Sequence, residues 1–112
     1  MNPWKHLEKV RQKSSRLWLG LMSGTSLDGL DIALVAISGS GSSTKISLEA
    51  FASPPYSADW QHCLQNFTNP MEVSAIELGQ LHVSLGSHWA EIVLQQLNEW
   101  QIDPKFIDAV AS

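Results

Sequence analysis

The chain has 112 residues, of which 44% are hydrophobic and only 16% are charged, and its formal net charge is −4. This length suits one domain of ordinary size, and the charged fraction is well below the roughly 25% of an average soluble protein. Ten of the eleven acidic residues follow residue 16. The composition argues against nucleic-acid binding, because nucleic acids are bound by Lys and Arg side chains that replace phosphate counterions.

The basic residues are concentrated at the start of the chain, where five of the seven lie within the first 16 positions. We expect a solvated basic tail over residues 1–15 and a domain over residues 16–112; contact between the tail and an anionic partner is the alternative. The tail lacks the apolar core of a secretory signal, and no run approaches the roughly 18 apolar residues of a membrane span. Cys63 is the single cysteine, so no internal disulfide can form, and we expect a cytoplasmic protein with no membrane partner.

Three strands are predicted in the first half of the chain. Residues 17–22 and 30–37 are apolar runs without polar alternation, which is typical of central strands covered on both faces. The Asp28-Gly29 dipeptide between them is a strong hairpin signal and predicts antiparallel pairing. A flexible turn then leads to residues 44–51, whose alternation predicts a strand with one solvated face, ended by Pro54-Pro55.

Two helices are predicted next. Ser57 can cap a short helix that is closed by Asn69-Pro70. Ser74 and Glu77 form a capping box for a long helix that reaches about residue 100 and is ended by Asp103-Pro104.

Glycines and a last apolar run complete the predicted architecture. Gly79 and Gly86 weaken the long helix by about 1 kcal/mol each relative to Ala, so we interpret them as marks of close packing against the sheet. Residues 106–111 predict another buried strand. A helix-containing crossover should make this strand parallel to its neighbour, which indicates an α/β fold.

The segment with the most chemistry is the turn over residues 23–31, which carries two glycines, three hydroxyls and two carboxylates. Glycine lets a ligand approach the backbone, hydroxyls can donate to phosphate oxygens, and successive N–H groups in such a turn form an anion-binding concavity. It is not a Walker A loop, because no Gly-Lys-Ser/Thr follows. A plain hairpin in which Asp28 serves turn geometry is the alternative.

The two carboxylates, Asp28 and Asp31, need an explanation if this turn binds phosphate. At 4 Å and an effective dielectric constant near 20, each unit of negative charge would repel a carboxylate by roughly 4 kcal/mol. Either the side chains turn away, or a magnesium ion and its waters lie between them and the phosphates. The four histidines show no metal-ligand spacing.

Residues 20–31, Gly-Leu-Met-Ser-Gly-Thr-Ser-Leu-Asp-Gly-Leu-Asp, followed by Ile-Ala-Leu-Val, resemble the opening of the anhydro-N-acetylmuramic acid kinases. The resemblance runs from about Arg16 to Ser112 and includes residues 77–81. That family belongs to the actin, Hsp70 and hexokinase-like ATPase superfamily. The resemblance therefore implies the N-terminal half of an actin-like (ribonuclease H-like) ATPase domain, with three antiparallel strands, then helices, then a parallel strand.

The resemblance also implies a reaction and its partners. The family uses ATP and Mg²⁺ to cleave the 1,6-anhydro bridge of a recycled cell-wall sugar with water while phosphorylating O6, giving N-acetylmuramate 6-phosphate. The small-molecule sugar and ATP are thus the expected partners. The resemblance does not decide whether the full-length protein is a homodimer. The residues that carry over to ATP binding are Gly24, Thr25, Ser26, Leu27, Asp28, Gly29, Leu30 and Asp31.

The resemblance departs from the superfamily at Met22, where many members have an aspartate that contacts metal-bound water. Ser23, Asp28 and Asp31 are the candidates for that contact here. The general base is expected beyond Ser112, so no catalytic residue is assigned and we expect the 112 residues alone to be inactive.

Two other functions remain open from the sequence. One is an actin-like ATPase with another sugar acceptor, because the hairpin does not define the acceptor. The other is a non-catalytic binding or assembly module, or an inert truncated product. Whatever its function, the chain expressed alone is expected to self-associate or to be poorly soluble, because a strand edge and apolar faces are left uncovered.

Overall fold

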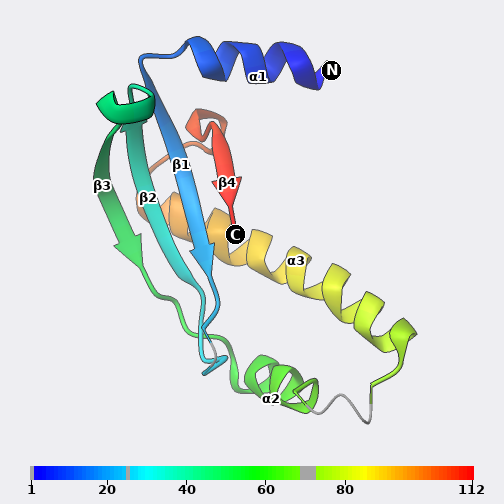
Figure 1. Cartoon of the computed structure of the whole chain (residues 1–112). Coiled ribbons are helices and arrows are strands. Elements are labelled where there is room, and N and C mark those ends of the chain that lie inside the picture. Colours follow the sequence, from blue (N-terminus) through cyan, green and yellow to red (C-terminus); the bar gives the residue numbers. More distant parts are fainter. Residues whose placement is uncertain (1, 25, 69–72) are drawn as a thin grey trace.

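The computed structural model describes residues 2–24, 26–68 and 73–112 (Figure 1). The elements, in chain order, are α1 (Pro3–Gln12), β1 (Ser15–Met22), β2 (Asp31–Ser38), the 3-10 turn η1 (Gly41–Ser43), β3 (Lys45–Ala52), α2 (Ala58–Asn66), α3 (Ala75–Glu99), the 3-10 turn η2 (Pro104–Phe106) and β4 (Ala109–Ala111). None of the helices in these ranges combines the length and apolarity needed to cross a bilayer.

The four strands form one mixed sheet in the order β3-β2-β1-β4. β1 pairs antiparallel with β2, and β2 pairs antiparallel with β3. β4 returns after the two helices and lies parallel to β1. The predicted α/β class is confirmed, with three antiparallel strands, then helices, then a parallel strand.

The core lies between the sheet and α3, which crosses one face of it (Figure 1). Leu19 and Leu34 are buried cross-strand partners, and Leu97 is the buried residue of α3. Ile32 is buried as well, because it lies two positions before Leu34 on the same face of β2.

The opposite face of the sheet carries exposed apolar side chains. Ile46, Leu48 and Phe51 of β3 are more than half exposed. On the same face, Met22 of β1 is 65% exposed and the residues of β2 are only partly buried, so β1 and β2 are not fully covered on both faces as expected, within the described residues. Alternation did place Ile46 and Leu48 on one face of β3, but it is the face turned away from α3. A register shift between Leu34 and Val35 places Ala50 rather than Glu49 opposite Leu34, next to the core.

The helix starts follow the predicted caps. The hydroxyl of Ser57 accepts the N–H of Trp60 at the start of α2, and that of Ser74 accepts the N–H of Glu77 at the start of α3. The first residues of the chain, expected as a solvated tail, form the exposed helix α1, which Asn2 caps. Asn69-Pro70, expected to close α2, lies outside the described residues.

Asp103-Pro104 was expected to end α3, but the structure shows that Gln101 ends it. Gln101 has a φ of 60°, and its N–H donates to the carbonyl of Asn98. The N–H of Ile102 donates to the carbonyl of Leu97 at 2.9 Å. This is the Schellman arrangement, in which a left-handed residue reverses the chain and satisfies the last helical carbonyls.

The helix glycines do not mark close packing among the described residues, and that interpretation is wrong for this part of the chain. A Cβ atom built on Gly79 or Gly86 would meet no heavy atom within 4 Å. Gly86 instead lines an open apolar hollow of about 460 Å³ between α3 and the strands β1 and β4.

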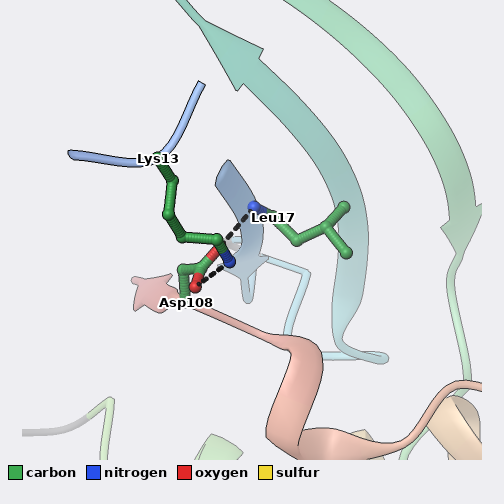
Figure 2. Close-up of polar contacts among 3 residues, drawn as sticks. All are labelled: Lys13, Leu17 and Asp108. Atoms are coloured by element: carbon green, nitrogen blue, oxygen red, sulfur yellow. Dashed lines mark hydrogen bonds and ion pairs between the residues drawn. The ribbon is translucent and has the colours of Figure 1, made fainter. Parts of the chain in front are cut away.

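Asp108 anchors the start of β4 to β1 (Figure 2). Its carboxylate accepts the N–H of Leu17 at 2.9 Å and the ammonium of Lys13 at 2.7 Å, while its own N–H donates to the Leu17 carbonyl at 2.8 Å. β4 is shorter than the predicted strand over 106–111, because Phe106 belongs to η2 and pairing with β1 begins only at Ala109.

Candidate functional site

The chemistry-bearing turn predicted from the sequence is the hairpin between β1 and β2, here called the β1–β2 hairpin and defined as residues 23–30. It lies at the end of the sheet nearest α2 (Figure 1). The N–H of Leu27 donates to the Gly24 carbonyl at 3.1 Å, and Leu27 adopts a φ of 55°. Leu27 also packs its half-buried side chain against the core. A left-handed leucine is unusual, so core packing at Leu27 helps to hold a backbone shape that the local chain disfavours.

The two glycines of the hairpin differ in their surroundings. Among the described residues, a Cβ atom on Gly24 would meet only Ser26 Oγ, at 3.9 Å, so the backbone at Gly24 is open there to an approaching group. A Cβ atom on Gly29 would lie 2.6 Å from the Pro54 carbonyl oxygen. Gly24 therefore suits contact with a ligand, whereas Gly29 is required by the fold itself.

The second half of the hairpin is held by the segment that follows β3. The N–H of Leu30 donates to the Pro54 carbonyl at 3.0 Å, and the N–H of Tyr56 donates to the Asp28 carbonyl at 2.8 Å. Gly29 and Pro55 form an antiparallel bridge between these contacts. The hairpin is therefore fixed in place by backbone hydrogen bonds and not only by its own turn.

Of the residues expected to bind ATP, Leu30 has a structural role in this chain. Its side chain is 0% exposed, and its N–H is already bonded to Pro54. Neither group can therefore reach a ligand. Thr25, also expected at this site, lies outside the described residues.

Asp28 in the hairpin and Asp31 at the start of β2 each accept a hydrogen bond from a neighbouring hydroxyl. Ser26 Oγ donates to Asp28 Oδ1 at 2.9 Å, and Ser53 Oγ donates to Asp31 Oδ1. Asp31 lies opposite Met22 in the register of β1 and β2. Met22 itself is 65% exposed and its side chain offers no oxygen, so Asp31 is the carboxylate paired with this position.

Asp28 and Asp31 are carboxylates of the kind that bind magnesium, and the described residues form no closed metal cage. Within the described ranges, no group of three or more His, Cys, Asp or Glu side chains is close enough to hold a metal. Mg²⁺ is usually bound by one or two carboxylates, by waters and by substrate phosphates, so Asp28 and Asp31 suffice in number and chemistry.

Sequence reasoning missed Tyr56, which touches both sides of the hairpin. Its hydroxyl donates to Ser23 Oγ at 3.0 Å and accepts the indole N–H of Trp89 at 2.8 Å. Trp89 is a partly buried residue of α3 that packs against the core. No local pattern predicts this contact, because Ser23 lies in the hairpin, Tyr56 in the loop after β3 and Trp89 in α3, far apart in sequence.

Comparisons with known proteins point to one family. A family model described as anhydro-N-acetylmuramic acid kinase matches residues 16–112. The protein with this name from Pseudoalteromonas translucida is 42% identical over 110 residues, covering 96% of this chain and 27% of that relative. The one from Pseudoalteromonas atlantica is 39% identical over 111 residues, covering 96% and 28%. The one from Caldanaerobacter subterraneus is 35% identical over 106 residues, covering 95% and 27%. The chain thus spans about a quarter of the length of these relatives.

Proposed function

Because the chain belongs to the anhydro-N-acetylmuramic acid kinase family, we propose that its β1–β2 hairpin binds the phosphates of ATP in a kinase for the anhydro sugar. The proposed reaction cleaves the 1,6-anhydro bridge of anhydro-N-acetylmuramic acid with water and transfers the γ-phosphoryl group to O6. The product is N-acetylmuramate 6-phosphate, formed in the cytoplasm during cell-wall recycling. The single observation that carries the proposal is the open backbone at Gly24, with the hydroxyls of Ser23 and Ser26 beside it.

The hairpin supports phosphate binding through its hydrogen-bond donors. Phosphate oxygens only accept hydrogen bonds, and a hydrogen bond to a charged group contributes roughly 1.5–3 kcal/mol. Gly24 has no side chain to hold a phosphate away from the backbone, and Ser26 is exposed next to it. Ser26 has one hydroxyl hydrogen, which now goes to Asp28; donating to phosphate would require it to leave that carboxylate.

Asp28 and Asp31 are the residues proposed to hold Mg²⁺, directly or through its waters. The ion would neutralise charge on the phosphates when it is bound. Without a cation, each carboxylate beside the phosphates would be repelled by roughly 4 kcal/mol per unit charge at 4 Å. Ser53 fixes the orientation of the Asp31 carboxylate by donating to one oxygen, which leaves the other oxygen for the ion or its water.

The acceptor sugar is supported by family membership and not by the hairpin. No residue described above distinguishes one sugar hydroxyl from another, and the general base that activates water is expected outside residues 1–112. The relatives named above are all anhydro-N-acetylmuramic acid kinases, which favours this acceptor over other sugars.

The proposal is tested by two matched glycine variants of the whole kinase that contains this chain. Gly24→Ala adds a methyl group where the structure has room, so the fold should be kept while the phosphates lose close access to the backbone. Gly20→Ala adds a methyl group in β1 with nothing within 4 Å and serves as the control. We expect Gly24→Ala to weaken ATP binding about tenfold or more, the equivalent of one charge-assisted hydrogen bond, measured by calorimetric titration. Wild-type affinity for ATP in a folded Gly24→Ala variant would contradict the proposal.

A further inference from the structure

The side chains of Trp89, Tyr56 and Ser23 form a chain of two hydrogen bonds that ends in the β1–β2 hairpin. Trp89 Nε1 lies 2.8 Å from Tyr56 Oη, and Tyr56 Oη lies 3.0 Å from Ser23 Oγ. Tyr56 is 3% exposed, and Trp89 is half-buried on α3. The contact therefore joins the core of the molecule to the first residue of the hairpin, through a tyrosine that is almost fully shielded from water.

The chemistry of the three groups fixes the direction of this chain. An indole N–H can only donate, so Tyr56 Oη must act as the acceptor from Trp89. That contact leaves the single hydroxyl hydrogen of Tyr56 unused, and because Tyr56 is buried this hydrogen needs an acceptor, which Ser23 Oγ provides at 3.0 Å. The hydroxyl hydrogen of Ser23 is not used in that contact and stays available to donate elsewhere. A phosphate oxygen, which can only accept, is the partner that this arrangement suits.

The backbone of Tyr56 holds the other side of the same hairpin. Its N–H donates to the Asp28 carbonyl at 2.8 Å. Tyr56 thus contacts the hairpin at its first residue through the side chain and near its end through the main chain. One residue thereby sets the separation of the two sides between which Gly24 and Ser26 lie.

We propose that Tyr56 is a positioning residue for nucleotide binding, which orients the Ser23 hydroxyl as a donor to the phosphates of ATP. This inference rests on the proposed phosphate-binding role of the hairpin. It adds that Ser23 contacts a phosphate oxygen and that Tyr56, with Trp89 behind it, acts through Ser23. A tyrosine with a purely structural role would affect stability without selectively weakening the binding of nucleotide.

The test uses the whole kinase with Tyr56→Phe, Ser23→Ala and the double variant. The readouts are the dissociation constant for a non-hydrolysable ATP analogue, the KM for the anhydro sugar and the thermal midpoint. We expect Ser23→Ala to weaken analogue binding about tenfold and Tyr56→Phe to weaken it about three- to tenfold. The double variant should bind no more weakly than Ser23→Ala, because Tyr56 acts through Ser23. The KM for the sugar should stay at its wild-type value in all three.

Two further variants separate this role from a general loss of stability. Ser57→Ala removes the cap of α2, next to Tyr56 in sequence, and should lower the thermal midpoint without changing analogue binding. Trp89→Phe leaves the tyrosine hydroxyl in place but removes the donor that fixes its direction. It should weaken analogue binding about threefold, and it keeps the test available if Tyr56→Phe does not fold.

The outcomes distinguish this inference from the proposed function. Wild-type analogue binding in Tyr56→Phe, or in Trp89→Phe if the former does not fold, together with a loss in Ser23→Ala, would overturn the role of Tyr56 alone. Independent, multiplying losses in the double variant would overturn it as well, and so would an equal loss in Ser57→Ala. Wild-type binding in both Ser23→Ala and Gly24→Ala would instead remove the phosphate-binding role of the hairpin itself.

Discussion

Lys13 and Asp108 are 95 positions apart in the chain, and their side chains form an ion pair with an Nζ–Oδ1 distance of 2.7 Å (Figure 2). The Asp108 side chain is only 10% exposed, whereas that of Lys13 is about half exposed. The same carboxylate accepts the N–H of Leu17, so it links the segment before β1, β1 itself and β4. This pair fixes the parallel strand on which the order of the sheet depends.

Removing the charge of Asp108 should destabilise the fold. In Asp108→Asn, the ion pair with Lys13 is lost and the Leu17 N–H has a weaker acceptor, so we expect unfolding to become easier by about 1–3 kcal/mol. Urea denaturation measures this change. Glu8→Gln, which alters the exposed Glu8–Arg11 pair at 3.9 Å, is the control and should change stability by less than about 0.5 kcal/mol. Equal effects of the two substitutions would show that Asp108 does not anchor β4.

Low pH should destabilise the fold through the same carboxylate, that of Asp108. Burial raises the pKa of Asp108, but the hydrogen bonds from Lys13 and Leu17, together with the nearby positive charge, outweigh it, so the pKa lies below its ordinary value of 3.8. A carboxyl with a lowered pKa in the folded state contributes stability above its unfolded pKa, and this contribution is lost as the pH falls through the folded pKa. The Asp108 contribution should therefore be intact near neutral pH and disappear below about pH 3.8. Asp108→Asn should remove this part of the acid dependence in urea titrations from about pH 6 to about pH 2.5; an unchanged dependence would contradict the assignment.

Gly29 should tolerate no side chain, even though its φ is not in the left-handed region. In Gly29→Ala, the new methyl group would lie 2.6 Å from the backbone oxygen of Pro54, which cannot move without breaking its bond from Leu30. We expect a loss of about 1–3 kcal/mol, measured by thermal or urea unfolding. Gly24→Ala in the same hairpin should keep wild-type stability. A neutral Gly29→Ala would show that the segment after β3 does not hold the hairpin.

Replacing Gln101 with glycine should stabilise the protein. It terminates α3 at a φ of 60°, where a side chain is strained and glycine is not. We expect Gln101→Gly to raise the free energy of unfolding by about 0.5–1 kcal/mol. The same chemical change at exposed Gln95, inside α3, should lower it by about 1 kcal/mol. Changes of the same sign at both positions would contradict the left-handed cap.

Local signals in the sequence were reliable where the cause is local. Ser57 and Ser74 predicted the helix starts, because capping depends on a few neighbouring residues. Asp28-Gly29 predicted the antiparallel pairing of β1 and β2, but the left-handed residue described in the hairpin is Leu27 and not Gly29. The end of α3 was misplaced because Gln101, which is not a glycine, takes the left-handed conformation. Ile46 and Leu48 show a similar limit: alternation predicts that two residues share a face, but not which face packs against a helix.

In the candidate site, too, local features were predicted from the sequence and long-range contacts were not. The composition of the turn predicted phosphate binding. Leu30, which was expected to take part, is instead buried in the core. No local signal indicated that Tyr56 contacts Ser23. That contact exists only because the loop after β3 brings Tyr56 between the hairpin and Trp89 of α3. Long-range contacts of this kind are set by the tertiary structure and are not visible in a single sequence.

The most direct test of phosphate binding by the β1–β2 hairpin is a crystal structure of the whole kinase with Mg²⁺ and a non-hydrolysable ATP analogue. We expect phosphate oxygens within hydrogen-bonding distance of the backbone at Gly24 and of the Ser23 or Ser26 hydroxyls, with the ion or its waters next to Asp28 or Asp31. A bound analogue whose phosphates lie away from this hairpin would contradict the account.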